Sequence, residues 1–235
     1  MIIRRAQDRG VARFGWLHSQ HTFSFGHYYD PAHMGFGPLR VINQDVVKPG
    51  AGFDTHGHAD MEIISYVLKG ALEHRDSIGT GSVIVPGEVQ RMTAGTGIRH
   101  SEYNHSKTDP VEFLQIWIIP EEQGLEPGYE QKTFAPAGMN GTFRLVGSRD
   151  GRGDSITIHQ DVNLYAAHLN AEDAALTVAE DRGVWVQVIK GSVTLNGETL
   201  ADGDGAALTE VTELHFRDNR QAEVLVFDMK MSAFK

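Results

Sequence analysis

Cysteine is absent from the 235-residue chain. Without a thiol there can be no disulfide, no thiolate nucleophile, no iron–sulfur cluster and no cysteine-ligated zinc. Any metal site must therefore be built from imidazole and carboxylate groups. A chain of this length can bury over two-thirds of its unfolded surface, so the fold needs no covalent cross-link.

Long hydrophobic runs and an excess of positive charge are also missing. The apolar run at residues 114–120 is far shorter than the roughly 20 residues of a membrane-spanning helix. The first ten residues have no apolar core of signal-peptide length. With 21 Lys and Arg against 31 Asp and Glu, the net charge is −10, which argues against binding to nucleic acid or to an anionic membrane. We expect a cytoplasmic protein that binds neither.

Glycine is abundant, with 26 residues spread along the chain. The glycines separate short runs rich in Val, Ile, Tyr and Phe, and no window of helical length has a sustained 3.6-residue period. Such runs lie at residues 39–47, 62–69, 82–85, 111–119, 184–190 and 223–229. Frequent short strands without intervening helices predict an all-β protein made of sandwiches or barrels.

The two halves of the chain resemble each other. "YVLKGALEH" from Tyr66 aligns with "QVIKGSVTL" from Gln187, and a second glycine turn follows each segment. Chance similarity between short hairpins is the alternative, but the repeat favours two barrels of one ancestral type. Between residues 120 and 140 the strand pattern lapses, so we predict a linker there. The predicted domains are residues 1–125 and 126–235.

Two spaced pairs of side chains suggest a metal site. His56 and His58 are two residues apart, as are His100 and Glu102, so in strands each pair points to one face. If the two strands face each other inside a barrel, three imidazoles and one carboxylate meet at one point. That donor set suits a divalent first-row metal with open positions. A solvated strand face is the alternative for any single His-x-His pair.

The same residues stand in a longer pattern that resembles the cupin motifs. The first motif comprises Gly50, His56-x-His58, Glu62 and Gly70, with one extra residue before the last glycine. The second runs from Gly81 through Pro86-Gly87 to His100. The string "PGEVQRMTAGTGIRHSE" at residues 86–102 is similar to the pirin branch of the bicupins. Further matching segments lie at residues 21–31, 39–47, 114–118, 127–132, 184–191 and 223–229. Within that family, the chain resembles the bacterial pirin-like quercetin 2,3-dioxygenases.

The resemblance implies a fold and a ligand set. The implied fold is a bicupin, with two stacked jelly-roll β-barrels of which the N-terminal one binds metal. The pirin ligands correspond to His56, His58, His100 and Glu102. Glu62 corresponds to the first-motif carboxylate of other cupins, and we expect it beside the ligands without touching the metal.

The C-terminal repeat lacks these donors. Aligned on the glycine turns, His56, His58 and Glu62 correspond to Thr177, Ala179 and Gly183. We therefore predict one metal per chain and a degenerate C-terminal barrel.

The remaining nine histidines are predicted to lie outside the metal site. They include His74 and a group between residues 18 and 33. We interpret them as surface or structural residues, and lining of the N-terminal barrel's mouth is the alternative for the group.

The resemblance also implies an activity. It predicts a metal-dependent dioxygenase that cleaves the heterocyclic ring of flavonols such as quercetin with O2 and releases CO. Fe(II) is the expected metal, with Ni, Mn, Co, Cu or Zn as alternatives, and Glu102 would be both ligand and proton acceptor. One alternative is an iron-dependent redox switch that binds a protein partner, with flavonol cleavage as a side activity. Another is a purely structural bicupin.

Overall fold

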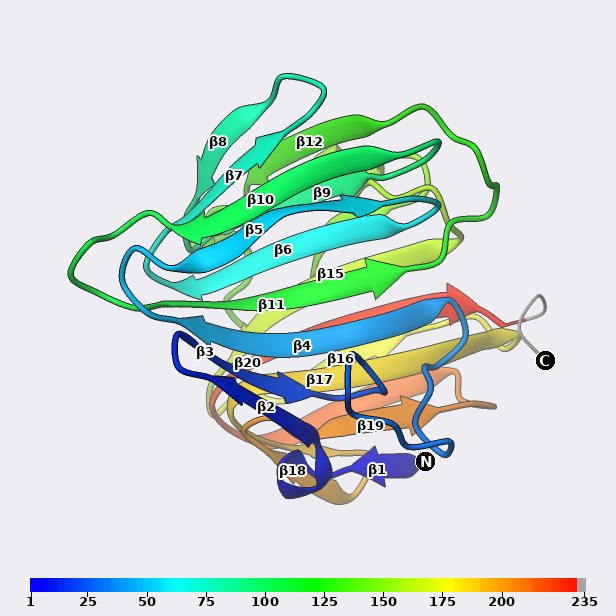
Figure 1. The fold of residues 1–235 in the computed structure, drawn as a ribbon. Helices are drawn as coiled ribbons and strands as arrows, with labels where there is room; N and C mark the ends of the chain where they lie inside the picture. Colours follow the sequence, from blue (N-terminus) through cyan, green and yellow to red (C-terminus); the bar gives the residue numbers. More distant parts are fainter. Residues whose placement is uncertain (232–235) are drawn as a thin grey trace. The chain divides into compact units, whose positions relative to one another are not determined.

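β-strands make up most of residues 1–231, which are the part of the chain that the computed structural model describes (Figure 1). The all-β prediction is confirmed. The helical segments in this part are three 3-10 turns of three residues each, and none is long or apolar enough to cross a membrane.

The described chain forms two units. The N-terminal unit comprises Gly10–Phe134 and Ile156–Gln160, and the C-terminal unit comprises Met1–Arg9, Ala135–Ser155 and the chain from Asp161 onward. The predicted division after residue 125 differs from this because hydrogen-bond pairing decides which unit a strand joins. β12 (Gly128–Thr133), inside the expected linker, pairs with β9 (Glu88–Thr93) of the N-terminal unit.

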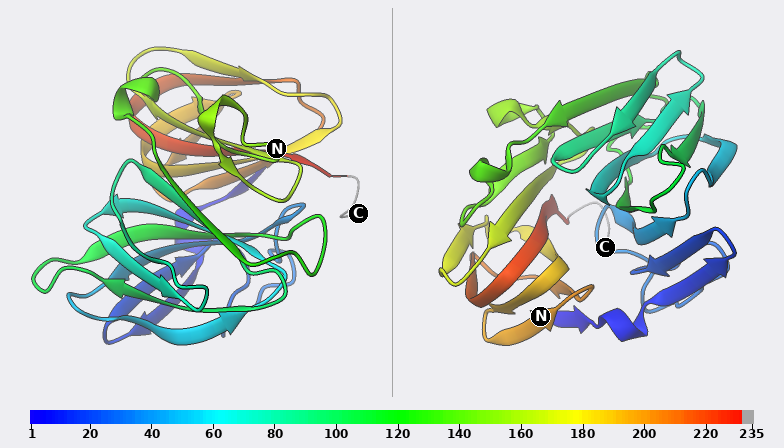
Figure 2. Two further views of the ribbon diagram at one scale, coloured as in Figure 1. Left: turned by 90° about the horizontal axis from the view of Figure 1, so that it is seen from above. Right: turned by 90° about the vertical axis from the view of Figure 1, so that its left-hand side faces the viewer.

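Two sheets build the N-terminal unit. One has four strands in the order β5-β10-β7-β8, and the other has seven in the order β12-β9-β6-β11-β4-β3-β2. The hairpin of β2 and β3 extends the larger sheet beyond β4 (Figure 2). The remaining strands of these sheets are β2 (Gly10–Phe14), β3 (Leu17–His21), β4 (Leu39–Val47), β5 (Gly52–His58), β6 (Glu62–Lys69), β7 (Leu72–Asp76), β8 (Gly81–Ile84), β10 (Ile98–Asn104) and β11 (Val111–Ile118). The two-residue strand β14 (Ile156–Thr157) belongs to this unit but to neither of the two sheets.

Because side chains alternate between the two faces of a strand, every second residue points into the interior of this unit. In β10 every second residue is buried, and these are Ile98, His100, Glu102 and Asn104. An apolar cluster that includes Val67, Ile84 and Phe113 fills part of the interior. The interior is therefore apolar with a set of polar residues carried on the same strand faces.

The C-terminal unit has a different interior. Its main sheet includes the strand order β1-β19-β17-β20-β15-β13, with β18 beside β17 and β16 beside β20. Its core is rich in valine and includes Phe216. Phe216 is the residue that corresponds to His100 when the second glycine turns of the two repeats, at Gly87 and Gly203, are aligned. The strands are β1 (Ile2–Arg4), β13 (Arg144–Ser148), β15 (Val162–Leu169), β16 (Ala174–Thr177), β17 (Arg182–Leu195), β18 (Glu198–Ala201), β19 (Gly205–Leu208) and β20 (Glu213–Lys230).

The first residues of the chain belong to this C-terminal unit. β1 pairs with β19, and the next residues are held by the buried carboxylate of Asp204. Its Oδ2 accepts a hydrogen bond of 2.8 Å from Arg5 Nη1, and its Oδ1 accepts one of 2.7 Å from the Ala6 amide. The Ala201 amide donates a third, of 3.2 Å. One side chain therefore ties β1 to the β18–β19 turn.

We expect Asp204→Ala to lower the free energy of unfolding by about 2 kcal/mol, because charge-assisted hydrogen bonds are lost and buried donors are left unpaired. Urea unfolding followed by circular dichroism measures it. The exposed Asp202→Ala is the matched control, and equal stability of the two variants would contradict this role.

Candidate metal centre

Three imidazoles meet where β5 and β10 pair. His56 lies directly opposite His100 in the antiparallel register, and His58 follows two residues along β5. His100 Nε2 lies 3.0 Å from His56 Nε2 and 3.1 Å from His58 Nε2. The two histidine strands are thus neighbours in one sheet, rather than strands facing each other across a barrel.

The spacing of these nitrogens fits one metal ion. Imidazole nitrogens bind first-row metals at about 2.0–2.1 Å, so two ligands at right angles lie about 3.0 Å apart. The three imidazoles can therefore occupy adjacent positions of one divalent ion and leave others open. Within residues 1–231, His56, His58 and His100 form the group of three metal-binding side chains whose ligand atoms all lie within 4.8 Å of one another.

Burial keeps two of the imidazoles, those of His58 and His100, in the form that binds metal. Burial, with the neighbouring His56, lowers the pKa of His58 to about 4. Burial and the surrounding histidines lower the pKa of His100 to about 2. Both rings are neutral at pH 7 and present a nitrogen lone pair, which metal coordination requires.

Hydrogen bonds on the far side of the rings orient them. His56 Nδ1 lies 2.7 Å from the Asp54 carbonyl oxygen, which assigns the proton to Nδ1 and leaves Nε2 free to ligate. His100 Nδ1 lies 3.5 Å from His74 Nδ1, and His74 Nε2 lies 2.9 Å from the Asp76 carboxylate. The side chains of His74 and Asp76 are fully buried.

His74 therefore has a position that its sequence context did not reveal. Two signals could have revealed the contact of His74 with His100. His74 and Asp76 are two residues apart on β7, and the β7–β10 register sets Asp76 opposite His100. Such outer hydrogen bonds set the tautomer and the basicity of metal-binding histidines.

Glu102 lies two residues beyond His100 and is 1% exposed. Its Oε1 accepts a hydrogen bond of 3.2 Å from Ser65 Oγ, and its Oε2 accepts one of 2.9 Å from Gln115 Nε2. Burial raises its pKa to about 7. The carboxyl is not a member of the three-imidazole cluster. It is a buried carboxyl on the same strand as the third imidazole.

The structure corrects the expected position of Glu62. Regular pairing of β6 with β9 runs through residues 62–65, so Glu62 and Ser65 lie on opposite faces of β6. Ser65 faces Glu102, whereas Glu62 Oε2 accepts hydrogen bonds from the backbone amide (3.1 Å) and Nδ1 (3.0 Å) of His159. Glu62 holds the segment at residues 156–160 and faces away from Glu102.

A row of buried polar side chains crosses the larger sheet at the level of Glu102. The register pairs residues of β3, β4, β11, β6 and β9 in succession. In that order they are His21, Asn43, Gln115, Ser65 and Gln90. Each is less than a tenth exposed. We call this set the polar row, and two of its members hold the carboxyl of Glu102.

A cavity of about 360 Å³ lies at the β3–β4 end of the polar row. Asn43, Gln115 and Asp45 line this cavity. Aromatic side chains also line it, and they come from the β2–β3 hairpin, from β5 and from the loop after β3. Asp45 is 2% exposed, and burial raises its pKa to about 7. His21 and His27, which we interpreted from sequence as surface or structural residues, also line this cavity.

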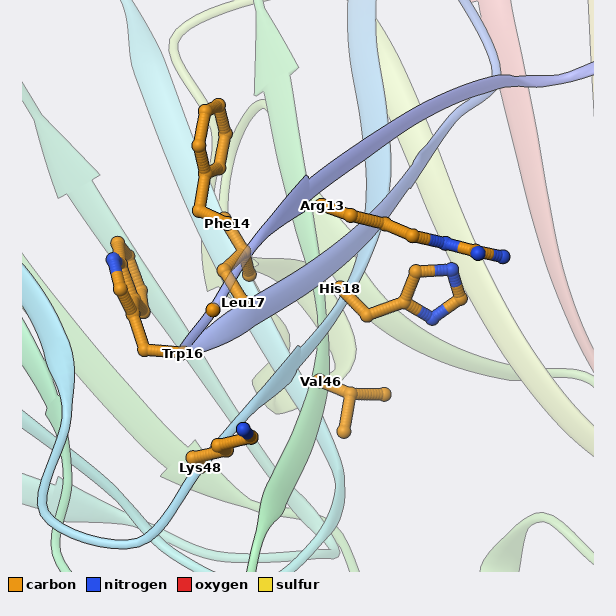
Figure 3. Close-up of a pocket in the computed structure, with 8 residues that line it drawn as sticks. Arg13, Phe14, Trp16, Leu17, His18, Val46 and Lys48 are labelled. Carbon is orange, nitrogen blue, oxygen red and sulfur yellow. The ribbon is translucent and has the colours of Figure 1, made fainter.

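A second hollow, of about 380 Å³, lies at the same hairpin and is drawn in Figure 3. Arg13 and His18 lie together on one side of the hairpin, and Phe14 and Trp16 point to the other side. Arg13, His18 and Val46 are register partners, and they lie on the strand face opposite to Ser19 and Asp45.

Two family models match the chain. The pirin model matches residues 4–118, and the model of the quercetinase C-terminal cupin domain matches residues 145–229. The chain belongs to the pirin family. The predicted bicupin fold of this pirin is thereby confirmed.

Relatives of this pirin share nearly its whole length. It is 49% identical over 231 residues to a quercetin 2,3-dioxygenase of Escherichia coli K12, covering 97% of this chain and 98% of the relative. The solved structure of the bacterial pirin YhhW from E. coli, in complex with nickel(II), is 48% identical with a TM-score of 0.93, covering 97% and 98% of the two chains. The E. coli protein YhaK is 29% identical with a TM-score of 0.75 over 95% and 94%.

We expect His74→Ala and Asp76→Asn each to weaken metal binding about 10- to 100-fold, because His100 loses the partner that sets its tautomer. Competition with a chromogenic chelator measures the dissociation constant for Ni(II). The exposed His105→Ala on the loop after β10 is the matched control. Wild-type affinity in both buried variants would contradict the orienting role.

We expect the stability of the metal-free protein to fall with rising pH because of Asp45. Its folded-state pKa of about 7 exceeds the unfolded value of 3.8, so the folded state holds this proton longer. The stabilisation is complete below pH 4 and is lost as the pH rises to 7. Relative to Asp45→Asn, the wild type should lose about 3 kcal/mol between pH 5 and pH 8. Urea unfolding at both values measures this, and the exposed Asp109→Asn should show no such difference.

Proposed function

We propose that this pirin binds one divalent metal ion, Fe(II), through His56, His58 and His100 and cleaves flavonols such as quercetin with O2, releasing CO. The observation that carries the proposal is the convergence of the ligand atoms of His56, His58 and His100 within 4.8 Å of one another, with the buried carboxyl of Glu102 on the same strand as His100. Imidazole donors also accept Ni, Mn, Co, Cu and Zn. The 49% identity to a protein named quercetin 2,3-dioxygenase supports the choice of substrate.

When bound, the metal supplies a Lewis-acidic, redox-active centre for the enol oxygen of the substrate and for dioxygen. His56, His58 and His100 set its charge and leave open positions. The outer contact from His74 keeps the His100 ring in one orientation.

Glu102 is the proposed proton acceptor for the flavonol 3-hydroxyl and the proposed fourth ligand. A base works best when its pKa lies near the working pH, and burial raises the pKa of this carboxyl to about 7. Ser65 and Gln115 hold its two oxygens in place. The proton taken from the substrate therefore goes to a carboxyl whose orientation the polar row maintains.

We expect the wild-type protein, loaded anaerobically with Fe(II) and then mixed with quercetin in air, to consume the flavonol and release CO. Loss of flavonol absorbance and a CO assay measure it. Glu102→Gln should keep its metal and lose at least 100-fold in rate, since general-base catalysis contributes about 10²–10⁴-fold. The double variant His56→Ala/His58→Ala should lose both metal and activity.

His168→Ala, in the C-terminal unit, is the control and should behave as wild type. Unchanged quercetin in the presence of one bound metal per chain would overturn the dioxygenase proposal. Capture of a protein partner that depends on the iron oxidation state would then favour the redox switch.

A further inference from the structure

The three imidazoles of the candidate centre differ in what orients them. The Nδ1 atom of His56 lies 2.7 Å from a backbone carbonyl oxygen, and that of His100 lies 3.5 Å from His74 Nδ1. His58 presents Nε2 to the cluster, so its ring proton resides on Nδ1 when Nε2 ligates. Among residues 1–231, this Nδ1 has no hydrogen-bond partner. The orientation of the His58 ring therefore depends on contacts of another kind.

An aromatic side chain from the other sheet of the N-terminal unit makes such a contact. The ring centroids of Trp117 and His58 lie 5.0 Å apart, and the two ring planes meet edge-to-face at 83°. His58 lies on β5 of the four-stranded sheet, whereas Trp117 lies on β11 of the seven-stranded sheet. Edge-to-face rings attract each other because the positive edge of one meets the negative face of the other. The contact therefore favours one tilt of the His58 ring.

Trp117 is itself held by two sets of contacts. It packs against a buried apolar cluster that includes Ile98, the register partner of His58. It also meets the ring of Phe25 edge-to-face, at 5.3 Å between centroids and 89° between planes. Phe25 belongs to the loop after β3, where it exchanges two backbone hydrogen bonds of 3.0 Å with Tyr28. The indole is thus fixed both by the interior and by this loop.

The strand that carries Trp117 contacts the centre at a second point. Gln115 and Trp117 are two residues apart on β11, so they share one face of the strand. Gln115 Nε2 donates a hydrogen bond of 2.9 Å to Glu102 Oε2, and Trp117 meets the ring of His58. One face of β11 therefore positions both a carboxyl and an imidazole that the other sheet carries.

We propose that Trp117 is a positioning residue of the metal centre, whose edge-to-face contact holds the His58 ring at the angle at which Nε2 ligates, with Phe25 keeping the indole in place. The inference rests on the proposed function, because it concerns the same metal site. A ligand that packing has oriented before the ion binds loses less rotamer freedom on binding. Removal of the indole should therefore weaken metal binding and change the arrangement of ligands around the ion.

The test compares Trp117→Leu and Trp117→Phe with the wild type, each as the full chain freed of metal by a chelator. Competition with a chromogenic chelator gives the dissociation constant for Ni(II), and the visible absorption of the Co(II)-loaded protein reports the ligand geometry. We expect Trp117→Leu to weaken Ni(II) binding about three- to tenfold, the effect of one lost edge-to-face contact, and to change the Co(II) spectrum. Trp117→Phe keeps a ring, so it should lie between Trp117→Leu and the wild type in both measurements.

Trp16→Leu is the matched control. Trp16 is also partly buried in the N-terminal unit and also makes an edge-to-face contact, with Phe53 at 5.1 Å and 83°. Within residues 1–231 it has no ring contact with the three imidazoles, so its variant should keep the wild-type Ni(II) affinity and Co(II) spectrum. If Trp117→Leu does not fold, as judged by circular dichroism, Phe25→Leu takes its place. It removes the ring behind the indole and should weaken Ni(II) binding about twofold or more, with a changed Co(II) spectrum.

Wild-type Ni(II) affinity in Trp117→Leu, or in Phe25→Leu where that variant replaces it, would overturn the inference. Weaker binding with an unchanged Co(II) spectrum would also overturn it, because the indole would then act through packing alone. Either result leaves the proposed function in place. A wild-type protein that binds no divalent metal would instead overturn the proposed function, and this inference with it.

Discussion

The antiparallel register of β5 and β10 is the constraint on which the candidate centre depends. It sets His56 opposite His100 and brings their Nε2 atoms to 3.0 Å. A slip of one residue would turn every side chain of one strand to the other face. Between His100 and Glu102 the pairing of β10 with β5 shifts in register, whereas the pairing of β10 with β7 stays regular. β10 therefore carries both a member of the imidazole cluster and a carboxyl outside that cluster.

Buried polar groups are the second shared feature of the N-terminal unit. A barrel interior that served stability alone would be filled with apolar side chains, since an unsatisfied buried polar atom is costly. Here the polar row crosses five strands, and two of its members, Ser65 and Gln115, donate hydrogen bonds to the two oxygens of Glu102. The polar row thus holds in place a buried carboxyl whose pKa is raised by burial to about 7.

The C-terminal unit shows what a related β-unit looks like without this requirement. Its interior is a valine-rich cluster, and Phe216 is fully buried at the position that aligns with His100. Its polar contacts include those of Asp204, which secures the first residues of the chain. In this pirin the same strand-and-glycine-turn pattern therefore supports an apolar core in one unit and, in the other, an interior that carries buried polar side chains and the three-imidazole cluster.

The spacing within single strands could be interpreted from sequence alone. Residues two apart share a face, so the pairs at residues 56–58 and 100–102 were recognisable, as was the all-β architecture from the glycine-bounded runs. Contacts between strands distant in sequence were not. The face of Glu62, the contact of His74 with His100, the polar row and the membership of β1 and β12 depend on register and sheet order. Those are set by non-local hydrogen bonding and packing, which no local pattern encodes.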